Sequence, residues 1–404
     1  MKKMNVLYVS TLCSERVISQ MLNNNLGNTN LAAQKFHRLI VQGMALNTDL
    51  FNVHVVSVPV FDKVYNDKKY FLFKNETEFG VNYSYTPIVA IPILKRFITA
   101  FFLCRKIAKW IIRYKKEESI IVFDILNLGT SIVSLFCSKL FFTRSVTIVT
   151  DLPSQMYVFK QKLSLINKVV IKFQNWMLKM ADGYVFLTEA MNVECNEQGK
   201  PYCIIEGMAD FQLLNRKDVK SIENRKDIIH YSGGLFEIYG VKALVDAFML
   251  IENENIRLHL FGQGDLVDYI KECVAKDPRI VFLGYKDNIT VLEDQSGSLI
   301  LVNPRFSHAD YTRFSFPSKT IEYMASGVPL LTTKLPGIPK EYLDYVLLFE
   351  QESVDEYKNT IENILKLSRV ELKRIGHNAR NFVLVNKNNK KQTLKFYSSF
   401  YSKS

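Results

Sequence analysis

The sequence alternates short apolar strands with longer helical stretches, and this alternation constrains the fold more than any other feature. Candidate strands in the first half lie at residues 5–10, 53–58, 119–124, 145–150 and 183–187, with helical spacing in stretches such as 31–45 and 98–114. Strands that are apolar throughout and alternate with helices predict a parallel sheet covered by helices on both faces.

The same alternation restarts after a polar, charge-rich stretch at residues 215–227, which is typical of an interdomain linker. Strands are expected at 228–232, 257–261, 280–283, 298–302 and 328–332, with helices at 241–251 and 266–276. We therefore predict an α/β fold of two Rossmann-like domains facing a central cleft. The expected domains are 1–205 and 206–385, followed by a helix at 386–404 that crosses back to the N-terminal domain.

Charge is distributed unevenly along the chain. Residues 1–205 carry 25 basic and 14 acidic side chains, residues 206–350 carry 16 and 21, and the net charge of the whole chain is +12. A basic N-terminal half suggests attraction to an anionic surface, and an ordinary solvated surface is an equally good explanation. No nucleic-acid-binding motif accompanies the charge, so a nucleic-acid partner is not expected.

Motifs that need a metal or a covalent nucleophile are absent from the sequence. Six cysteines are scattered without a CxxC pair, which argues against structural zinc or disulfides and fits a reducing cytoplasm. There is no Walker A loop, GxSxG or HExxH motif, and no DxD pair of carboxylates to hold a divalent cation against a diphosphate. The sequence therefore predicts no metal and no cofactor.

The most informative segment is Asn-Pro-Arg at 303–305 followed by FSFPSKTIEYMASGVP at 314–329. Pro317 suits the first position of a helix and Gly327 suits the left-handed position after its end, so a short helix is expected at 317–326. A strand precedes this helix, and ligands of such sheets bind beyond the carboxyl ends of the strands. The helix N-terminus is therefore expected to open toward the cleft.

The first turns of this helix carry residues suited to a nucleotide. Free backbone N–H groups and the positive end of the helix dipole form a natural diphosphate site, with Ser318 and Lys319 in the first turn. The Glu322 carboxylate is placed to accept two hydrogen bonds from a ribose diol. A capped amphipathic helix whose glutamate faces water is an equally common outcome.

This segment resembles the donor-binding helix of retaining glycosyltransferases of family 4, in the subgroup whose helix begins with Phe-Pro-Ser-Lys. The resemblance covers nearly the whole chain, with further motifs at 149–153 (VTDLP), 231–235 (YSGGL), 281–284 (VFLG) and 335–339 (LPGIP). It implies a GT-B fold, retention of anomeric configuration, no metal, and a nucleotide-sugar donor. Bacterial members build surface glycans, so the resemblance implies a glycan, lipid-linked or protein acceptor.

The resemblance assigns ribose binding to Glu322, which matches the second glutamate of the family's E-x7-E pair. The first glutamate falls at Phe314, so its contact with the donor sugar would pass to Asp310 or to a backbone group. The family's Arg and Lys after the linker fall at Gly234 and Tyr239. Both charges are missing, although Gly234 is still expected to line the donor site.

Other groups must then stabilise the charge that grows on the leaving diphosphate. Arg305, Arg313 and Lys319 are the remaining basic candidates, and an arginine can grip phosphate with two donors. A solvated surface position is the alternative for either arginine. Gly337 of the LPGIP motif completes the expected donor site. Asp151, after a buried strand, is expected to orient a hydroxyl or act as a general base, with a loop-capping role as the alternative.

The stretch from Ile98 to Tyr114 combines aromatic and aliphatic residues with a high density of Lys and Arg. It fits a buried helix of the N-terminal domain, and it also fits a helix at an anionic lipid surface. We expect a cytoplasmic protein, peripheral at the inner face of the cell membrane. The apolar run at 120–138 is better explained by a strand, a loop and a buried helix than by a membrane span.

Two other functions are compatible with the missing charges. One is a non-catalytic subunit that keeps the fold and stimulates another transferase. The other is a GT-B epimerase of nucleotide sugars, which would need paired carboxylates that the sequence does not locate.

Overall fold

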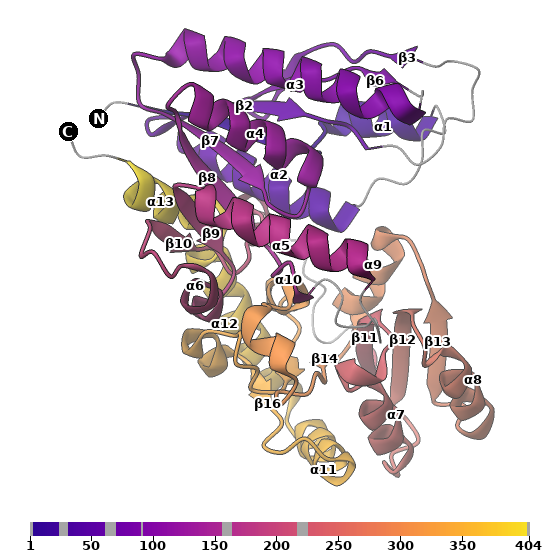
Figure 1. Cartoon of the computed structure of the whole chain (residues 1–404). Coiled ribbons are helices and arrows are strands. Elements are labelled where there is room, and N and C mark those ends of the chain that lie inside the picture. Colours follow the sequence, from indigo (N-terminus) through magenta and orange to yellow (C-terminus); the bar gives the residue numbers. More distant parts are fainter. Residues whose placement is uncertain are drawn as a thin grey trace. The chain divides into compact units, whose positions relative to one another are not determined.

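The structure is a computed structural model that describes residues 3–23, 31–60, 70–89, 92–155, 164–215 and 225–401 (Figure 1). Its contacts divide the chain into two compact units, one of residues 1–211 with 388–404 and one of residues 212–387. The chain changes unit at 211/212 and 387/388, where the sequence suggested 205/206 and 385/386. Most of the expected linker at 215–227 lies outside the described residues.

The N-terminal unit is built on an eight-stranded sheet in the order β10-β9-β8-β7-β1-β2-β5-β4. All neighbouring strands are parallel except β4 and β5. The strands are β1 (Met4–Ser10), β2 (Phe51–Ser57), β4 (Glu76–Glu78), β5 (Val81–Tyr85), β7 (Ser119–Asp124), β8 (Arg144–Val149), β9 (Gly183–Phe186) and β10 (Tyr202–Ile204). A separate antiparallel pair joins β3 (Tyr70–Phe71) to β6 (Ile88–Val89). The sequence did not predict β3 to β6, which are short and partly polar.

The helices of this unit lie on both faces of the sheet. They are α1 (Glu15–Asn23), α2 (Leu31–Leu46), α3 (Pro92–Tyr114), α4 (Leu128–Leu140), α5 (Leu165–Met180), α6 (Glu189–Cys195) and α13 (Asn389–Phe400). The chain moves across the sheet in one direction from β1 to β2. From β5 to β7, and then to β8 and β9, it moves in the opposite direction. Right-handed crossovers therefore place α2 on one face and α3, α4 and α5 on the other. In agreement, α13 packs on α2, while α4 contacts both α3 and α5 (Figure 1).

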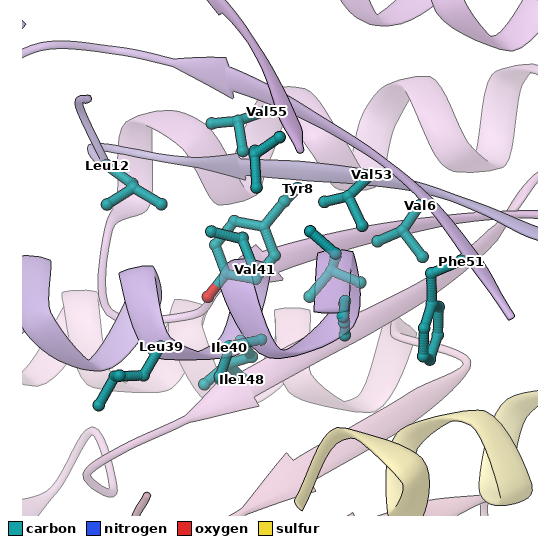
Figure 2. Close-up of a cluster of buried hydrophobic side chains, with 14 of the residues drawn as sticks. Val6, Tyr8, Leu12, Leu39, Ile40, Val41, Phe51, Val53, Val55 and Ile148 are labelled. Atoms are coloured by element: carbon teal, nitrogen blue, oxygen red, sulfur yellow. The ribbon is translucent and has the colours of Figure 1, made fainter. Parts of the chain in front are cut away.

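Strand β1 is buried along its whole length because it lies in the middle of the sheet. Figure 2 shows Val6 and Tyr8 of β1 in one apolar cluster with Val53 of β2 and Val41 of α2. The apolar run at 120–138 is strand β7 and helix α4, as expected. Within the described residues, no helix combines the length and apolarity needed to cross a membrane.

The C-terminal unit contains a six-stranded parallel sheet in the order β13-β12-β11-β14-β15-β16. Its strands are β11 (Ile228–Gly234), β12 (Arg257–Gln263), β13 (Ile280–Gly284), β14 (Ile300–Asn303), β15 (Leu330–Thr332) and β16 (Leu347–Leu348). Its helices are α7 (Val241–Met249), α8 (Val267–Lys276), α9 (Asn288–Gly297), α10 (Ser318–Ser326), α11 (Val354–Leu365) and α12 (Arg369–Asn386). This is the Rossmann strand order, which confirms the predicted fold class.

The ends of α10 differ slightly from the expectation. Pro317 is the N-cap, with φ −67° and ψ 110°, so the helix begins one residue later than predicted. An extended N-cap is the usual geometry before a first turn, which explains the shift. Gly327 ends the helix at φ 75°, the left-handed conformation expected of it.

Each sheet has one point where the strand order reverses, between β1 and β7 and between β11 and β14. Helices leave to opposite faces there, so the carboxyl ends of these strands are where ligands of such sheets bind. The reversals therefore mark one candidate site in each unit.

The last helix is joined to the N-terminal unit by close backbone contacts. Ala209 forms a parallel bridge with Asn388, and the Phe211 amide donates to Asn389 Oδ1 at 2.9 Å. A Cβ atom at Gly43 of α2 would overlap the carbonyl oxygen of Asn389. Glycine at this position lets α13 and α2 approach each other.

We expect Gly43→Ala to lower the stability of the N-terminal unit by about 1–3 kcal/mol, because overpacking must push α13 away from α2. Urea unfolding followed by circular dichroism measures this. Gly129→Ala is the matched control, since its Cβ would meet only Asn127 Oδ1, at 3.7 Å. Equal midpoints for the two variants would contradict the close packing of α13.

Candidate functional site

Helix α10 is anchored at the strand reversal of the C-terminal unit. The Ser232 amide, near the carboxyl end of β11, donates to the Tyr323 hydroxyl at 2.9 Å. Tyr323 is fully buried, so this bond fixes the helix against the sheet edge. Ser318 is exposed at the start of the helix. The helix therefore presents its N-terminal N–H groups and positive dipole at the edge where ligands bind.

Two of the predicted residues on this helix contact each other. The Lys319 ammonium lies 2.7 Å from the Glu322 carboxylate, and the two side chains are 34% and 18% exposed. The sequence assigned the lysine to the diphosphate and the glutamate to the ribose. In the structure they form one ion pair, which a nucleotide would have to share or exchange.

Arg305 follows β14 and reaches toward the end of β11. Its guanidinium lies 4.3 Å from the centre of the Tyr239 ring, in cation–π geometry. Burial raises the pKa of Tyr231 and of Tyr311, and the charge of Arg305 opposes both shifts. Arg305 is therefore half-buried among tyrosines, beside the position where the family's lysine would stand.

Gly234 is the last residue of β11 and lies close to Tyr239, the ring that Arg305 contacts. Its carbonyl accepts a hydrogen bond from the Tyr231 hydroxyl at 2.7 Å. A Cβ atom there would approach the rings of Phe236 and Tyr239 to 2.7 and 3.0 Å. The aromatic side chains thus occupy the space that a side chain at position 234 would need.

Arg313 and Asp310 lie together on the short 3-10 helix Asp310–Phe314 before α10. Their ion pair measures 3.1 Å, and the side chains are largely exposed. Arg313 also lies over the Phe314 ring at 4.4 Å. The two charges partly neutralise each other, which makes Arg313 a weaker candidate for the diphosphate than Arg305.

Gly337 is buried, and packing accounts for its residue type. A Cβ atom there would overlap the carbonyl oxygen of Ser315 and lie 2.5 Å from that of Thr312. The glycine lets the loop after β15 pack against the segment that leads into α10. Its expected role in donor binding stays a prediction.

The predicted residue of the N-terminal unit, Asp151, lies directly after β8 and is exposed. Desolvation of its carboxyl group by the surrounding protein raises the pKa of Asp151 to about 6. A hydrogen bond from Thr150 opposes this shift, and repulsion from the Asp124 carboxylate adds to it. Two carboxylates therefore stand at the ends of adjacent strands.

A second group of residues beside Asp124 was not predicted from the sequence. The Tyr8 hydroxyl lies 2.5 Å from His37 Nδ1, and His37 Nε2 lies 3.5 Å from the Asp124 carboxylate. Tyr8 and His37 are buried, and Asp124 ends β7 at the strand reversal. The one sequence feature that points to this group is a tyrosine, Tyr8, inside the apolar strand β1. No spacing in the sequence links it to His37 or Asp124. This relay of contacts can orient the Asp124 carboxylate.

Three or more His, Cys, Asp or Glu side chains in metal-binding proximity do not occur among the described residues. The expectation that neither a metal nor a cofactor takes part stays a prediction.

Comparison with known proteins assigns the C-terminal unit. Residues 215–382 match the family model described as Glycosyl transferases group 1. The matched residues make up nearly all of the C-terminal unit. N-acetyl-alpha-D-glucosaminyl L-malate synthase of Bacillus anthracis is 26% identical to the chain over 236 residues, or 54% of this chain. The match spans 58% of that relative's length.

Two solved structures share the fold over nearly the whole chain. Sucrose-phosphate synthase from Thermosynechococcus elongatus has a TM-score of 0.63 at 17% identity, over 98% of both chains. HepE from Anabaena, solved with UDP, has a TM-score of 0.61 at 14% identity, over 98% of this chain and 100% of its own. These likenesses identify the fold as GT-B. The resemblance stated from the sequence is confirmed, with the group 1 domain as its centre.

The Asp151 carboxyl is expected to titrate near pH 6, measured by carboxyl carbon-13 NMR and assigned by loss of the signal in Asp151→Asn. Asp124→Asn should lower this pKa, because it removes the neighbouring negative charge. Asp265→Asn, on the other unit, is the control and should leave the pKa unchanged. A pKa near 4 in the unsubstituted protein would mean that water solvates the carboxyl freely.

Proposed function

We propose that this protein is a retaining, metal-independent glycosyltransferase that uses a nucleotide-sugar donor. The observation that carries the proposal is the position of α10 in the group 1 domain, where Tyr323 holds it at the carboxyl end of β11 and Lys319 pairs with Glu322. HepE, which shares the fold, was solved with UDP, and this supports a nucleotide in the same domain. We further propose a hexosyl donor and a role in surface polysaccharide or glycoconjugate synthesis.

Recognition of the nucleotide begins with the ion pair on α10. In the proposed complex Glu322 accepts hydrogen bonds from the two ribose hydroxyls, as a carboxylate can with both oxygens. Lys319, 2.7 Å away, then turns toward the diphosphate. Ser318 and the first backbone N–H groups of the helix complete the anion site.

Departure of the nucleotide is the step that needs positive charge. The anomeric C–O bond to the diphosphate breaks as the acceptor oxygen forms a new bond on the same face, and the acceptor proton passes to a phosphate oxygen. Negative charge grows on the diphosphate, and Arg305 is the best-placed side chain to stabilise it. Desolvation by the surrounding tyrosines strengthens that interaction.

The acceptor is assigned to the N-terminal unit. Asp124 and Asp151 lie at the carboxyl ends of its strands, with His37 of α2 beside Asp124, and there they can orient an acceptor hydroxyl. Contact with an anionic membrane surface through the stretch from Ile98 to Tyr114 is part of the same proposal, because it would bring this unit to a lipid-linked acceptor.

A panel of UDP-, GDP- and ADP-sugars, incubated with the protein and EDTA, tests the activity. We expect hydrolysis or transfer from one donor class, unaffected by EDTA, because no DxD pair exists to hold a cation. Loss of activity that magnesium or manganese restores would refute metal independence. Inversion of the sugar would identify an epimerase, and absence of nucleotide binding a non-catalytic subunit.

Glu322→Gln should weaken nucleotide binding by about 1.5–3 kcal/mol, the usual value of hydrogen bonds to a charged group. Isothermal calorimetry with the active nucleotide measures it. Glu362→Gln is the matched control, since Glu362 is also paired with a lysine of its own helix, Lys358. Unchanged affinity in a folded Glu322 variant would remove this helix from the donor site.

Arg305→Ala should lower kcat about a hundredfold, or about 2.7 kcal/mol, while the donor Kd changes little. Arg305→Lys should recover part of this loss, because a point charge remains. Lys319→Ala should also lower kcat more than affinity. Arg313→Ala is the comparison and should have a smaller effect, since Asp310 already pairs with it. Steady-state rates give kcat and binding isotherms give the donor Kd. A larger loss of kcat in the Arg313 variant than in the Arg305 variant would assign stabilisation of the diphosphate to Arg313.

A further inference from the structure

The helices α3, α4 and α5 form one layer over one face of the N-terminal sheet, and this layer has an extreme charge. Their sequences contain ten Lys and Arg residues and no Asp or Glu. The net charge of the whole chain is +12, so most of the excess is located in three adjacent helices. Figure 1 shows these helices side by side.

The outward side of α5 is apolar as well as basic. Ile166, Val169, Phe173 and Trp176 recur at spacings of three and four residues and are exposed, with Trp176 at 54%. The rings of Phe173 and Trp176 are stacked, with their centroids 5.5 Å apart. The other side of the helix, with Gln174 and Leu178, is buried. The exposed stripe is therefore a second apolar face that the protein's own core does not use.

The apolar surface continues onto the other two helices. On α4, Ile132 and Phe136 are exposed one turn apart, and Phe142 just after the helix is 97% exposed. On α3, Phe97 and Phe101 are exposed, again one turn apart. Soluble monomers rarely expose large apolar patches of this kind unless a partner binds there.

Cations are interleaved with these apolar side chains. Lys168 and Lys172 alternate with them along the exposed side of α5. On α3, burial lowers the pKa of Lys106, and repulsion from Lys109 and Arg105 lowers it further. The positive charges are therefore close enough to destabilise one another, and a negative surface would relieve that repulsion.

We propose that the face formed by α3, α4 and α5 docks on an anionic lipid bilayer, with Trp176 and Phe173 at the boundary between headgroups and acyl chains. A bilayer supplies both an apolar layer and dense negative charge. A second copy of this chain fits poorly, because a two-fold contact would bring like charges together. The membrane contact proposed above for Ile98–Tyr114 thus becomes one edge of a larger surface, centred on α5.

The burial of one side of α3 is a reason to centre the surface on α5. Ile107, Trp110 and Ile111 are buried against the sheet, so they are unavailable to lipid. Only the outward side of α3 can take part, and α5 carries the exposed tryptophan. The chain has two tryptophans, and the other, Trp110, is 7% exposed. Trp176 is therefore a native fluorescent probe of the surface.

The test uses the full chain and vesicles of phosphatidylcholine with or without phosphatidylglycerol, free of donor and acceptor, so that transferase activity does not affect the result. We expect sedimentation with the anionic vesicles only, weakened by salt. Tryptophan emission should shift to shorter wavelength and be quenched by brominated lipids. Both changes should vanish in Trp176→Phe, while that variant still sediments.

Charge variants test the surface itself. Arg105→Gln with Lys168→Gln and Lys172→Gln should lower vesicle affinity about a hundredfold, since each cation near such a surface contributes about fivefold. The matched control replaces three exposed lysines of the C-terminal unit, Lys271, Lys286 and Lys366, and should bind normally. Circular dichroism confirms the folding of both variants.

Four results would overturn the proposal. They are failure to bind anionic vesicles at low salt, equal binding by both charge variants, unshifted Trp176 emission in the bound state, and self-association that Trp176→Ser abolishes. The last would assign the surface to a second copy of the chain. Retention of an acidic protein from a lysate, without vesicle binding, would assign it to a protein partner.

Discussion

The reversal of strand order in each parallel sheet is the constraint on which the rest of the structure depends. Parallel strands need crossover helices, and two crossovers that leave in opposite directions cannot both cover the strand ends between them. In the N-terminal unit these ends carry Asp124, with His37 and Tyr8 beside it. In the C-terminal unit they carry Arg305 and hold α10 through Tyr323. The polar chemistry of each unit gathers where the backbone leaves room for a ligand.

In the proposed donor site, Arg305 supplies a positive charge that the chain lacks at positions 234 and 239. The resemblance expects basic residues where this chain has Gly234, at the end of β11, and Tyr239. Arg305 comes from the neighbouring strand, and its guanidinium lies over the Tyr239 ring. The ring supports the cation electrostatically and excludes water from it. A planar guanidinium held this way is pre-organised for phosphate in a way that a flexible lysine is not.

The N-terminal unit uses its two helix layers differently. On one face, α13 and α2 approach closely around Gly43, where α13 fills the space beside the glycine. On the other face, α3, α4 and α5 bury one side against the sheet and leave aromatic and basic side chains on the other. Folding stability requires only the buried side. The exposed side costs solubility, so we attribute it to binding.

The sequence by itself determined the fold class and the position of α10. Apolar strands alternating with helices predicted both parallel sheets, because a strand buried on both faces has no polar side. Pro317 and Gly327 marked the helix ends through their backbone preferences alone. Only the tertiary structure revealed the partnership of Arg305 with Tyr239, the relay from Tyr8 to Asp124, and the surface on α5. Each joins residues far apart in the chain or depends on which helix face packs on the sheet, and local sequence patterns carry no record of either.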